Sequence, residues 1–435
     1  MTGDAERYTR LRELGWDMDV LRQSRVMVIG AGALGNEIIK NLALSGLGTL
    51  LLADPDRIET HNLTRSVLFR GSDVGAGKAE VAARTAEEIE PNLKVRWFDT
   101  KVQSTFGLGV FRRVDVVLGA VDNLQTRRDL NAASMRTGKP FIDGGLFFLD
   151  GDVRVFAAPY PACFDCTLSD EERADGQRRW SCLGLSDEGS AQSGPVGPTA
   201  PTISSMVGGL QAQLALKYLH RNTETLYKNR IPNATRIRFN GFADEYESWS
   251  LGRDVDCPTH LSAETIDDAD VQQTILSASS TGWDLLEQVQ RTHGQGAYID
   301  LGFDLVHSLV CGNCGRSDRS LQRQGAVPIS QTICPDCTAA SCRDCGSSIV
   351  ESAILNPELV FPDRIQCAHC FEPNEMFLRE ASTVNRIETG SPVLDHTLAD
   401  MTVPMLDLLE VGGSEDDHRA FIELTGDESA VFGDR

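Results

Sequence analysis

Four polar residues in the first third of the chain have the types and the spacing of a site for a charged nucleotide. Asn62 and Arg65 lie in the run ETHNLTR, and Lys78 lies in VGAGKAEV. Asp122 ends the strand-like run VDVVLGAVD. A triphosphate with magnesium requires such a set, because several negative charges must be neutralised while the α-phosphate is attacked. The diphosphate of NAD carries less charge and does not require it.

A glycine-rich turn precedes these residues and predicts where the nucleotide lies. The stretch VMVIGAGALGNEIIK places Gly30, Gly32 and Gly35 in a G-x-G-x-x-G pattern between a strand-like and a helix-like run. The first glycine permits the tight turn, the second lets the backbone approach a phosphate, and the third lets the helix pack on the strand. Asp54, at the end of the next strand-like run, is placed to bind ribose hydroxyls. The pattern alone leaves NAD, FAD and ATP open, and the four polar residues favour ATP.

Strand-like and helix-like runs alternate from residue 26 to about 145, and this alternation predicts the scaffold that positions the site. Strands joined by helices form a mainly parallel, doubly wound sheet. Beyond it, GDVRVFAAP, TRIRFNGF and YESWSL alternate polar and apolar residues, as antiparallel strands do. We therefore expect an α/β fold with a Rossmann-like, mainly parallel sheet that continues into antiparallel strands. The expected parallel strands are 26–30, 49–54, 94–99, 114–120 and 140–145, and the expected helices are one ending near 43, 79–90, 124–137 and 203–219.

The cysteines predict metal sites. Twelve cysteines in a chain without a recognisable secretion signal favour metal binding or catalysis over a disulfide framework. Cys163 and Cys166 form one pair of potential ligands, and the run DCPTH carries a second pair with the same spacing, Cys257 and His260. Three thiolates and one imidazole form a closed tetrahedral site, which is typical of structural zinc. The alternative leaves His260 as an ordinary loop residue beside a three-cysteine site.

Four further Cys-x-x-Cys pairs predict a C-terminal zinc-ribbon-like module with two zinc sites. The spacings C-x2-C-x19-C-x2-C over 311–337 and C-x2-C-x21-C-x2-C over 342–370 are both ribbon-like. A nested arrangement, with the two inner pairs on one ion and the two outer pairs on the other, is also compatible with the spacing. Bound metal would let this block fold although it has few large apolar residues. The eight predicted ligands are Cys311, Cys314, Cys334, Cys337, Cys342, Cys345, Cys367 and Cys370.

Length and charge restrict the remaining possibilities. A chain of 435 residues is expected to form two or three domains. Its net charge of −22 opposes binding to nucleic acid and to anionic membranes, and suits a partner with a basic face. No apolar run is long enough to cross a membrane, and the charged N-terminus lacks the apolar core of a secretion signal. We therefore expect a cytoplasmic protein.

Five motifs in order resemble the ThiF/MoeB superfamily, whose adenylating domain also occurs in ubiquitin-activating enzymes. They are RYTRL (7–11), the glycine turn, NLTR, GAGK and AVDN. The resemblance implies adenylation, with ATP and magnesium, of a small ubiquitin-like protein that has a Gly-ended C-terminus, and it implies a homodimer. The expected domains are an adenylation domain at 1–260, a mixed α/β or linker region at 261–310, a cysteine-rich double zinc-binding module at 311–374, and an acidic tail with short strands at 375–435.

The resemblance also implies a role for each matching residue. Asp122 binds magnesium, and Arg10 acts across the homodimer as an arginine finger. As alternatives, Asp122 caps the helix that starts near Leu124, and Arg10 is one of several charges on an N-terminal helix. The implied nucleotide-binding residues are Gly30, Gly32, Gly35, Asp54, Asn62, Arg65, Lys78, Asp122 and Asn123. The implied catalytic residues are Arg10, Arg65, Lys78, Asp122 and Cys182.

The role of Cys182 decides which reaction follows adenylation of the small protein. It lies in RRWSCLGL, where Arg178 and Arg179 favour the thiolate, and a Gly/Ser/Pro-rich run at 186–201 predicts a mobile loop beside it. In relatives that transfer the activated protein, a cysteine in this region forms a thioester and passes the protein to a conjugating enzyme. Alternatively the adenylate enters sulfur transfer, in a thiamine, molybdopterin or thio-modification pathway, and Cys182 is structural.

Three other kinds of protein fit parts of the sequence. A peptide-modifying adenylase, as in microcin maturation, is a third possible outcome of the adenylation, less favoured than conjugation or sulfur transfer. An NAD-dependent oxidoreductase would not need the cation set, and a non-catalytic docking scaffold would not need intact motifs. The region 261–435 is expected to recruit the protein substrate or the next enzyme, and its acidic surroundings favour a protein partner over nucleic acid.

Overall fold

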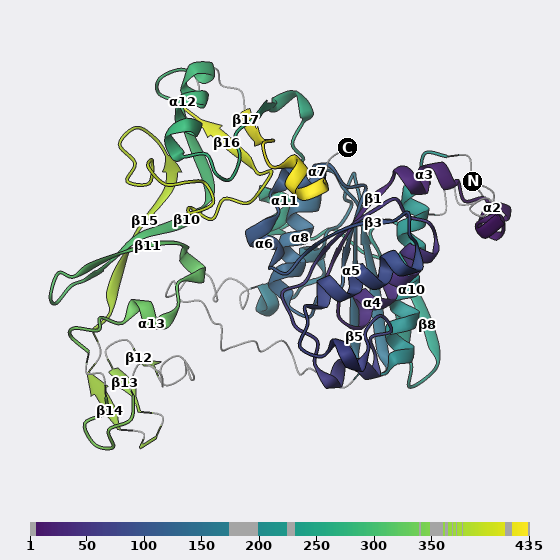
Figure 1. The fold of residues 1–435 in the computed structure, drawn as a ribbon, viewed down its shortest axis with the longest axis horizontal. Helices are drawn as coiled ribbons and strands as arrows, with labels where there is room; N and C mark the ends of the chain where they lie inside the picture. The colour runs from purple at the N-terminus through teal and green to yellow at the C-terminus, as the bar shows by residue number, and fades with distance from the viewer. Residues whose placement is uncertain are drawn as a thin grey trace.

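The computed structural model describes residues 6–173, 199–223, 231–338, 341–348, 360–361, 364–367, 369–370, 372–375, 377–413 and 420–433. Figure 1 shows an N-terminal α/β unit and a C-terminal sheet that projects from it. None of the helices in these ranges is both long enough and apolar enough to cross a membrane.

Eight strands form the central sheet of the α/β unit, in the order β3-β2-β1-β4-β5-β6-β7-β8. The first five strands in this order are parallel, and β6, β7 and β8 continue the sheet in antiparallel fashion. The predicted parallel sheet with an antiparallel extension is confirmed. The strands are β1 (Arg25–Ile29), β2 (Thr49–Ala53), β3 (Lys94–Phe98), β4 (Val116–Gly119), β5 (Phe141–Phe147), β6 (Asp150–Phe156), β7 (Thr235–Asn240) and β8 (Glu245–Ser250).

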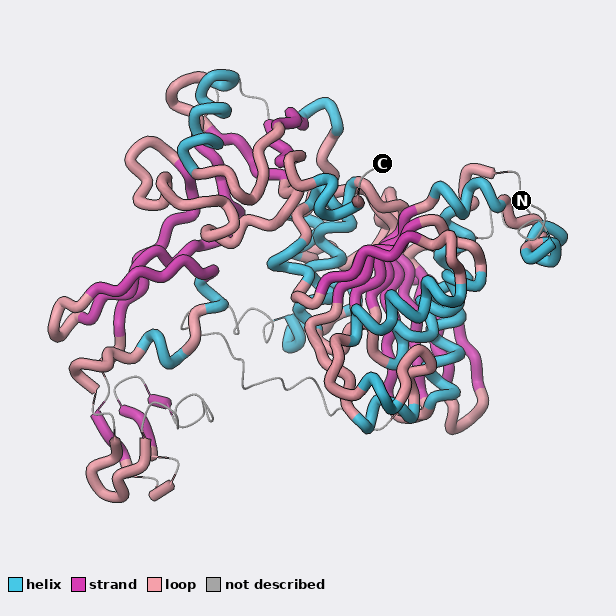
Figure 2. The backbone as a smooth tube through the Cα atoms, viewed as in Figure 1, coloured by secondary structure: helices cyan, strands magenta, loops and turns pink. Residues whose placement is uncertain are grey.

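Helices cover both faces of this sheet, because side chains along a strand alternate between its two faces. In β1, Val26 and Val28 join one buried cluster, and Met27 and Ile29 join another. Figure 2 shows helices on either side of the strands. The helices that pack into the first cluster are α4 (Ala33–Leu44), α5 (Lys78–Ile89) and α10 (Pro201–Leu219). Those that pack into the second are α6 (Val102–Thr105), α7 (Leu108–Arg112) and α8 (Leu124–Arg136).

Six strands form the C-terminal sheet, in the order β11-β10-β16-β17-β9, with β15 paired to β10. Its strands come from both sides of the zinc module, so the segments that we separate in the sequence as 261–310 and 375–435 build one sheet. The reason is burial: residues from both segments, with α12 (Gly282–His293), share one apolar cluster. The strands are β9 (Val271–Thr274), β10 (Tyr298–Cys311), β11 (Ser317–Arg323), β15 (Arg379–Ile387), β16 (Leu408–Gly412) and β17 (Ala420–Leu424).

The long strands β10, β11 and β15 form an arm that leads to the cysteine-rich region (Figure 1). At the opposite end of the C-terminal unit, α15 (Glu428–Phe432) returns to the α/β unit, where Arg96 donates to the Ala430 carbonyl at 2.9 Å. The small elements near the end of the arm are α13 (Ile329–Thr332), β12 (Val360–Phe361), β13 (Arg364–Gln366) and β14 (Pro373–Glu375). The remaining short helices are α2 (Thr9–Glu13), α3 (Met18–Gln23) and α11 (Pro258–Ser262).

Candidate functional site

The glycine turn joins β1 to α4 at the carboxyl ends of the parallel strands. Gly30 has a φ of +98°, and a Cβ on Gly35 would lie 2.0 Å from the Gly30 carbonyl oxygen. A side chain therefore fits at neither position. A Cβ on Gly32 would have no heavy atom within 4 Å, so Gly32 borders open space at the start of a 12-residue helix. A phosphate can approach the backbone there.

Asp54, directly after β2, supports this turn from the neighbouring strand. One carboxylate oxygen accepts a hydrogen bond from the amide of Ala31 at 2.5 Å, and the other accepts from the amide of Asp56 at 2.8 Å. Burial raises the pKa of Asp54, while both amides and the charge of Lys78 oppose the shift. Each oxygen keeps a further lone pair, so the carboxylate can still accept from ribose hydroxyls.

Lys78 lies beside this carboxylate at the first residue of α5. Its Nζ is 2.7 Å from Asp56 Oδ2, and its side chain is only 12% exposed. Asn62 is buried in a short 3-10 helix (Thr60–Thr64), where its Oδ1 accepts from the amide of Glu59 at 2.9 Å. Arg65 is half-buried at the end of that helix and donates to the His61 carbonyl at 3.3 Å. Among the described residues the Arg65 guanidinium makes no other hydrogen bond or ion pair, so it is available to a ligand.

Asn36 ties this loop to the glycine turn, although no sequence motif predicted a role for it. Its amide group donates to the carbonyls of Ala31, at 2.7 Å, and Gly32, at 3.0 Å. Its Oδ1 accepts from the amide of Leu68, three residues beyond Arg65, at 2.8 Å. The side chain is fully buried, and a buried amide must find hydrogen-bond partners. The position of Asn36 directly after the glycine pattern was the one sequence feature that could have indicated its role. Its hydrogen bond with Leu68 could not be inferred from local spacing.

Asp122 and Asn123 follow β4, next to the glycine turn. The amide of Ala120 donates to the Ile29 carbonyl at 2.8 Å, which fixes the two segments together. Asn123 caps α8, because its Oδ1 accepts from the amide of Thr126 at 2.8 Å. The alternative interpretation of Asp122 as the helix cap is therefore wrong. The exposed carboxylate of Asp122 makes no hydrogen bond or ion pair with the part of the chain that the structure describes.

Arg127 fixes the segment that carries Asp122. Its guanidinium donates to the Val121 carbonyl at 2.6 Å and to Asp143 Oδ2 at 2.6 Å. Asp143 is buried in β5, opposite Gly119 at the end of β4, and burial raises its pKa while the charge of Arg127 opposes the shift. Gln211 of α10 adds a second buried link, since its amide group donates to the carbonyls of Gly119 and Ile142. Neither Asp143 nor Gln211 was among the residues predicted from the sequence.

Arg10 lies apart from these residues. It is exposed on α2, where its guanidinium is 3.4 Å from Glu13, and Figure 1 shows α2 at the outer edge of the α/β unit. The helix is attached through Glu90, which accepts from the Tyr8 hydroxyl and lies 3.3 Å from the guanidinium of Arg7. Within one chain the structure does not bring Arg10 to the glycine turn.

Cys182 and most of the loop predicted at 186–201 lie outside the described residues. The described segment that precedes them is anchored by Arg173, whose guanidinium donates to the Asp165 carbonyl at 3.0 Å. Asp165 stands between two predicted zinc ligands, Cys163 and Cys166. Arg173, the last described residue before Cys182, is therefore held beside the first cysteine cluster.

The first cluster brings together the four residues predicted for it. Its ligand atoms lie within 4.8 Å of one another, with 3.6 Å between the sulfurs of Cys163 and Cys257 and 3.4 Å between Cys166 Sγ and His260 Nδ1. The Nε2 of His260 is 3.1 Å from the Tyr160 carbonyl oxygen, which can only accept a hydrogen bond. Nε2 therefore carries the ring proton, and Nδ1 is free for a metal. His260 is thus part of the cluster and not an ordinary loop residue.

The hydrogen bond between Cys163 and Cys166 shifts the pKa values of the two thiols in opposite directions. Hydrogen bonding with Cys166, together with burial, raises the pKa of Cys163. The hydrogen bond from Cys163 lowers the pKa of Cys166 to about 5. A thiolate at Cys166 suits a cation, since the thiolate is the form that ligates metal.

The later cysteines form two separate clusters, and the nested pairing is wrong. One cluster combines the pairs 311/314 and 334/337, and the other combines 342/345 and 367/370. Four ligands around zinc at about 2.3 Å place neighbouring sulfurs about 3.8 Å apart. The sulfur–sulfur distances are 3.9 Å for Cys311–Cys337, 3.7 Å for Cys314–Cys334, 3.6 Å for Cys342–Cys370 and 3.5 Å for Cys345–Cys367. All three clusters therefore fit tetrahedral zinc.

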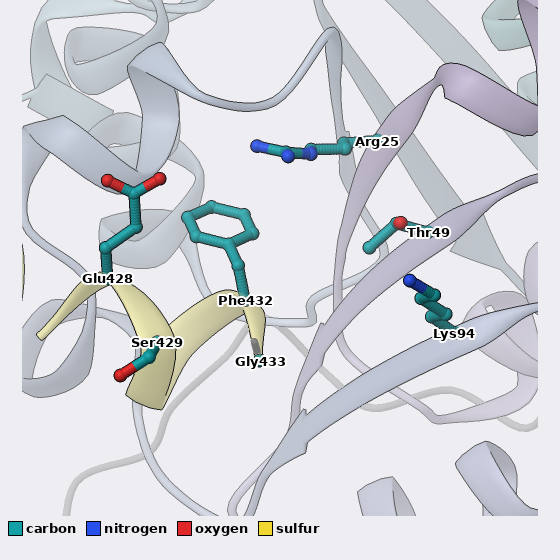
Figure 3. A pocket seen from close by; sticks show the side chains of 7 residues that line it. All are labelled: Arg25, Thr49, Lys94, Glu428, Ser429, Phe432 and Gly433. Carbon is teal, nitrogen blue, oxygen red and sulfur yellow. The ribbon is translucent and has the colours of Figure 1, made fainter. Parts of the chain in front are cut away.

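A surface pocket of about 310 Å³ lies at the amino-terminal ends of strands in the central sheet (Figure 3). Arg25, Thr49 and Lys94, the first residues of β1, β2 and β3, form one side of it. The helix α15 forms the other side, and its Phe432 ring lies 5.0 Å from the guanidinium carbon of Arg25. The glycine turn is at the carboxyl ends of these strands, so this pocket is separate from the candidate nucleotide site.

Comparison with known proteins relates the α/β unit to adenylating enzymes. The ThiF family profile matches residues 7–259. The chain is 29% identical, over 260 residues, to the sulfur carrier protein ThiS adenylyltransferase of Escherichia coli K12, covering 59% of this chain and 94% of that protein. It is 36% identical, over 165 residues, to the NEDD8-activating enzyme E1 catalytic subunit of Caenorhabditis elegans, covering 35% of this chain and 38% of that protein.

Other relatives are also matched over part of their length. The chain spans 51% of a sulfur carrier protein adenylyltransferase of Thermus thermophilus, at 36% identity over 139 residues. Among solved structures, Escherichia coli MccB with ATP gives a TM-score of 0.45 at 22% identity, covering 56% of this chain and 67% of that one. This structural likeness is too low to support an argument about the site.

Proposed function

This chain is a member of the ThiF family, and from that premise we propose that it adenylates the C-terminal carboxylate of a small ubiquitin-like protein. The observation that carries the proposal is the exposed carboxylate of Asp122, which has no polar partner among the described residues and lies beside an open glycine turn. An aspartate that does not cap the helix, next to a turn whose Gly32 borders open space, suits a magnesium–triphosphate complex. The names of the relatives, which include adenylyltransferases for sulfur carriers and an activating enzyme for NEDD8, support the same class of reaction.

Each residue of the site has a separate task in this reaction. The backbone at Gly32 approaches the phosphates, and Asp54 accepts from the ribose hydroxyls. Lys78 and Arg65 neutralise phosphate charge, with Lys78 exchanging Asp56 for phosphate. Magnesium, held by Asp122, would supply further positive charge at the phosphates. An oxygen of the substrate carboxylate attacks the α-phosphorus, the bond to the bridging oxygen breaks, and pyrophosphate leaves.

A second step is proposed for Cys182. The chain has twelve cysteines, and eleven of them lie in the three clusters, so Cys182 is the remaining one. Its thiolate attacks the acyl carbon of the adenylate, a thioester forms and AMP leaves. The protein then passes to a thiol of a conjugating partner. We propose that a homodimer supplies Arg10 to the site of the partner chain, since Arg10 does not reach it within one chain.

The regions after residue 260 are proposed to recruit proteins. The double zinc-binding module at 311–374 would dock the substrate or the conjugating enzyme at the end of the arm, and the segments 261–310 and 375–435 build the sheet that carries it. Zinc would hold each cysteine cluster in its tetrahedral form.

The test combines the purified chain with ATP, magnesium and small Gly-ended proteins encoded in the same genome. Non-reducing gels and intact mass are recorded for wild type and Cys182→Ala. A thiol-sensitive adduct on wild type that is absent from Cys182→Ala supports adenylation followed by thioester transfer. If neither wild type nor Cys182→Ala forms adenylated substrate and ATP remains unconsumed, the proposal is contradicted.

A second outcome has its own supporting observation. The sulfur carrier protein ThiS adenylyltransferase is matched over 94% of its length, far more than the NEDD8-activating subunit. Adenylated substrate without an adduct on either variant would favour sulfur transfer with a separate sulfur donor. Cys182 would then have a structural role.

A further inference from the structure

The C-terminal sheet is attached to the α/β unit at the segment between β3 and β4. The amide of Gly107 donates to the Met405 carbonyl at 2.9 Å, and the amide of Gly109 donates to the Leu406 carbonyl at 2.8 Å. The amide of Met405 in turn donates to the Thr105 carbonyl at 3.2 Å. The backbones of the two units are therefore paired directly along this contact.

Two glycines make this close approach possible. A Cβ on Gly107 would lie 2.3 Å from the Cα of Asp407, and a Cβ on Gly109 would lie 2.3 Å from the Leu406 carbonyl oxygen. Both neighbours are backbone atoms, which cannot move aside as a flexible side chain would. The two glycines of the GLG run at 107–109 thus allow its backbone to pack directly against residues 405–407, some 300 positions later in the chain.

Buried charges reinforce the contact. Glu423 of β17 is fully buried and lies 2.5 Å from the guanidinium of Arg113 and 3.3 Å from that of Arg112. Removing either partner of a buried pair is strongly destabilising, because a buried charge is then left uncompensated. The C-terminal sheet is therefore firmly fixed to α7.

The same segment supports the helix that begins beside Asp122. Gln103, on α6, donates from Nε2 to Thr126 Oγ1 at 2.9 Å and to Asp129 Oδ2 at 2.9 Å. Thr126 is the residue whose amide is capped by Asn123. At the other end of α8, the amide of Ile266 donates to the Arg136 carbonyl at 2.8 Å. Both ends of α8 are thus held by segments that run into the C-terminal contact.

We propose that Gln103 is a positioning residue for adenylation, and that the docked C-terminal sheet keeps it against the first turn of α8. Through Thr126 and the Asn123 cap, Gln103 fixes the turn that presents Asp122. The C-terminal unit is therefore part of the adenylating machinery as well as a carrier of zinc modules. This inference rests on the proposed function, because it requires Asp122 to act on the magnesium nucleotide.

The test uses the full chain with the change Gln103→Leu, which keeps the side chain's size and removes both hydrogen bonds. Binding of ATP is measured with magnesium and again with a chelator. We expect affinity for the magnesium complex to fall about three- to tenfold, as the loss of one or two hydrogen bonds implies. Affinity for metal-free ATP stays unchanged, because Gln103 acts only through Asp122. Gln322→Leu, on the arm, is the matched control and binds as wild type does.

A second pair of variants tests the role of the C-terminal sheet. Gly107→Ala forces the contact apart and is expected to weaken binding of the magnesium complex in the same way, whereas Gly252→Ala meets no atom within 4 Å and is the control. If Gly107→Ala does not fold, Gln103→Leu decides alone. Equal affinities for wild type and Gln103→Leu overturn the inference and leave the proposed function intact. Failure of wild type to bind ATP at all overturns both.

Discussion

Asn123 accepts a hydrogen bond from the amide of Thr126 at 2.8 Å, while the neighbouring carboxylate of Asp122 contacts no polar partner among the described residues. Two adjacent residues of suitable chemistry thereby take different tasks. Asn123 satisfies one of the unpaired amides at the start of α8, and Asp122 remains available to a ligand. The arrangement explains how an exposed carboxylate is kept in place beside the glycine turn.

The pair Asp122→Asn and Asn123→Ala tests this division of tasks. Asp122→Asn should leave the free energy of unfolding unchanged and reduce magnesium-dependent adenylation by about a hundredfold or more. Asn123→Ala should lower the free energy of unfolding by about 1 kcal/mol, because a cap is lost. Thermal unfolding and nucleotide turnover measure the two effects. A large stability loss in Asp122→Asn would contradict the assignment.

The glycine turn gives a second matched pair. Gly35→Ala should destabilise the fold, because the new Cβ meets the Gly30 carbonyl at 2.0 Å. Gly32→Ala has no protein atom within 4 Å of the new Cβ and should fold normally. Its affinity for ATP should fall about tenfold or more if phosphate occupies that space. Normal ATP affinity in a folded Gly32→Ala would show that the nucleotide lies elsewhere.

Zinc content is a third prediction. We expect three zinc ions per chain by elemental mass spectrometry, one for each cluster. Cys257→Ser should lose one ion and lower the melting temperature of the α/β unit, because Asn131 and Arg128 of α8 bind the loop between Cys163 and Cys166. Cys370→Ser should lose one ion without that effect, because its cluster lies beyond the arm. Fewer than three ions in wild type refolded with excess zinc would contradict the assignment.

Glu90 predicts a pH dependence of the N-terminal helix. Burial raises the pKa of Glu90, but hydrogen bonds from Tyr8 and Asn92 and the charge of Arg7 outweigh it and lower the pKa below the ordinary 4.5. A lowered pKa in the folded state stabilises the contact above the unfolded value, and this stabilisation is lost as the pH falls through the folded value. We therefore expect residues 6–14 to detach in acid.

Hydrogen exchange of residues 6–14, corrected for intrinsic rates, tests the role of Glu90. Wild type should show protection near pH 7 that is lost below about pH 4. Glu90→Gln should show reduced protection throughout, with no transition in that range. An unchanged transition in Glu90→Gln would assign the acid sensitivity to another group.

Local periodicity was sufficient for the α/β unit. Apolar runs such as VMVI and TLLLA are buried on both faces of a parallel sheet, so they are continuous and easy to recognise. The helix predicted at 79–90 is α5 (Lys78–Ile89), and that predicted at 124–137 is α8 (Leu124–Arg136). Metal ligands at short fixed spacing were equally clear, and His260 joined its cluster as expected.

Contacts between distant residues could not be predicted in the same way. The C-terminal sheet pairs β9 with β17 and β10 with β16, and the sequence between these strands gives no sign of their pairing. Asn36 and Gln211 have ordinary helical neighbours, and only their partners at Leu68 and Gly119 reveal their role. The choice between sequential and nested cysteine pairs also depended on distances.

Pyrophosphate exchange tests the central claim most directly. The full chain is incubated with ATP, magnesium, labelled pyrophosphate and each small Gly-ended protein of the same genome. We predict label in ATP only when one such protein is present, and loss of the exchange in Asp122→Asn. Exchange with none of these proteins, or exchange that persists in Asp122→Asn, would contradict the account.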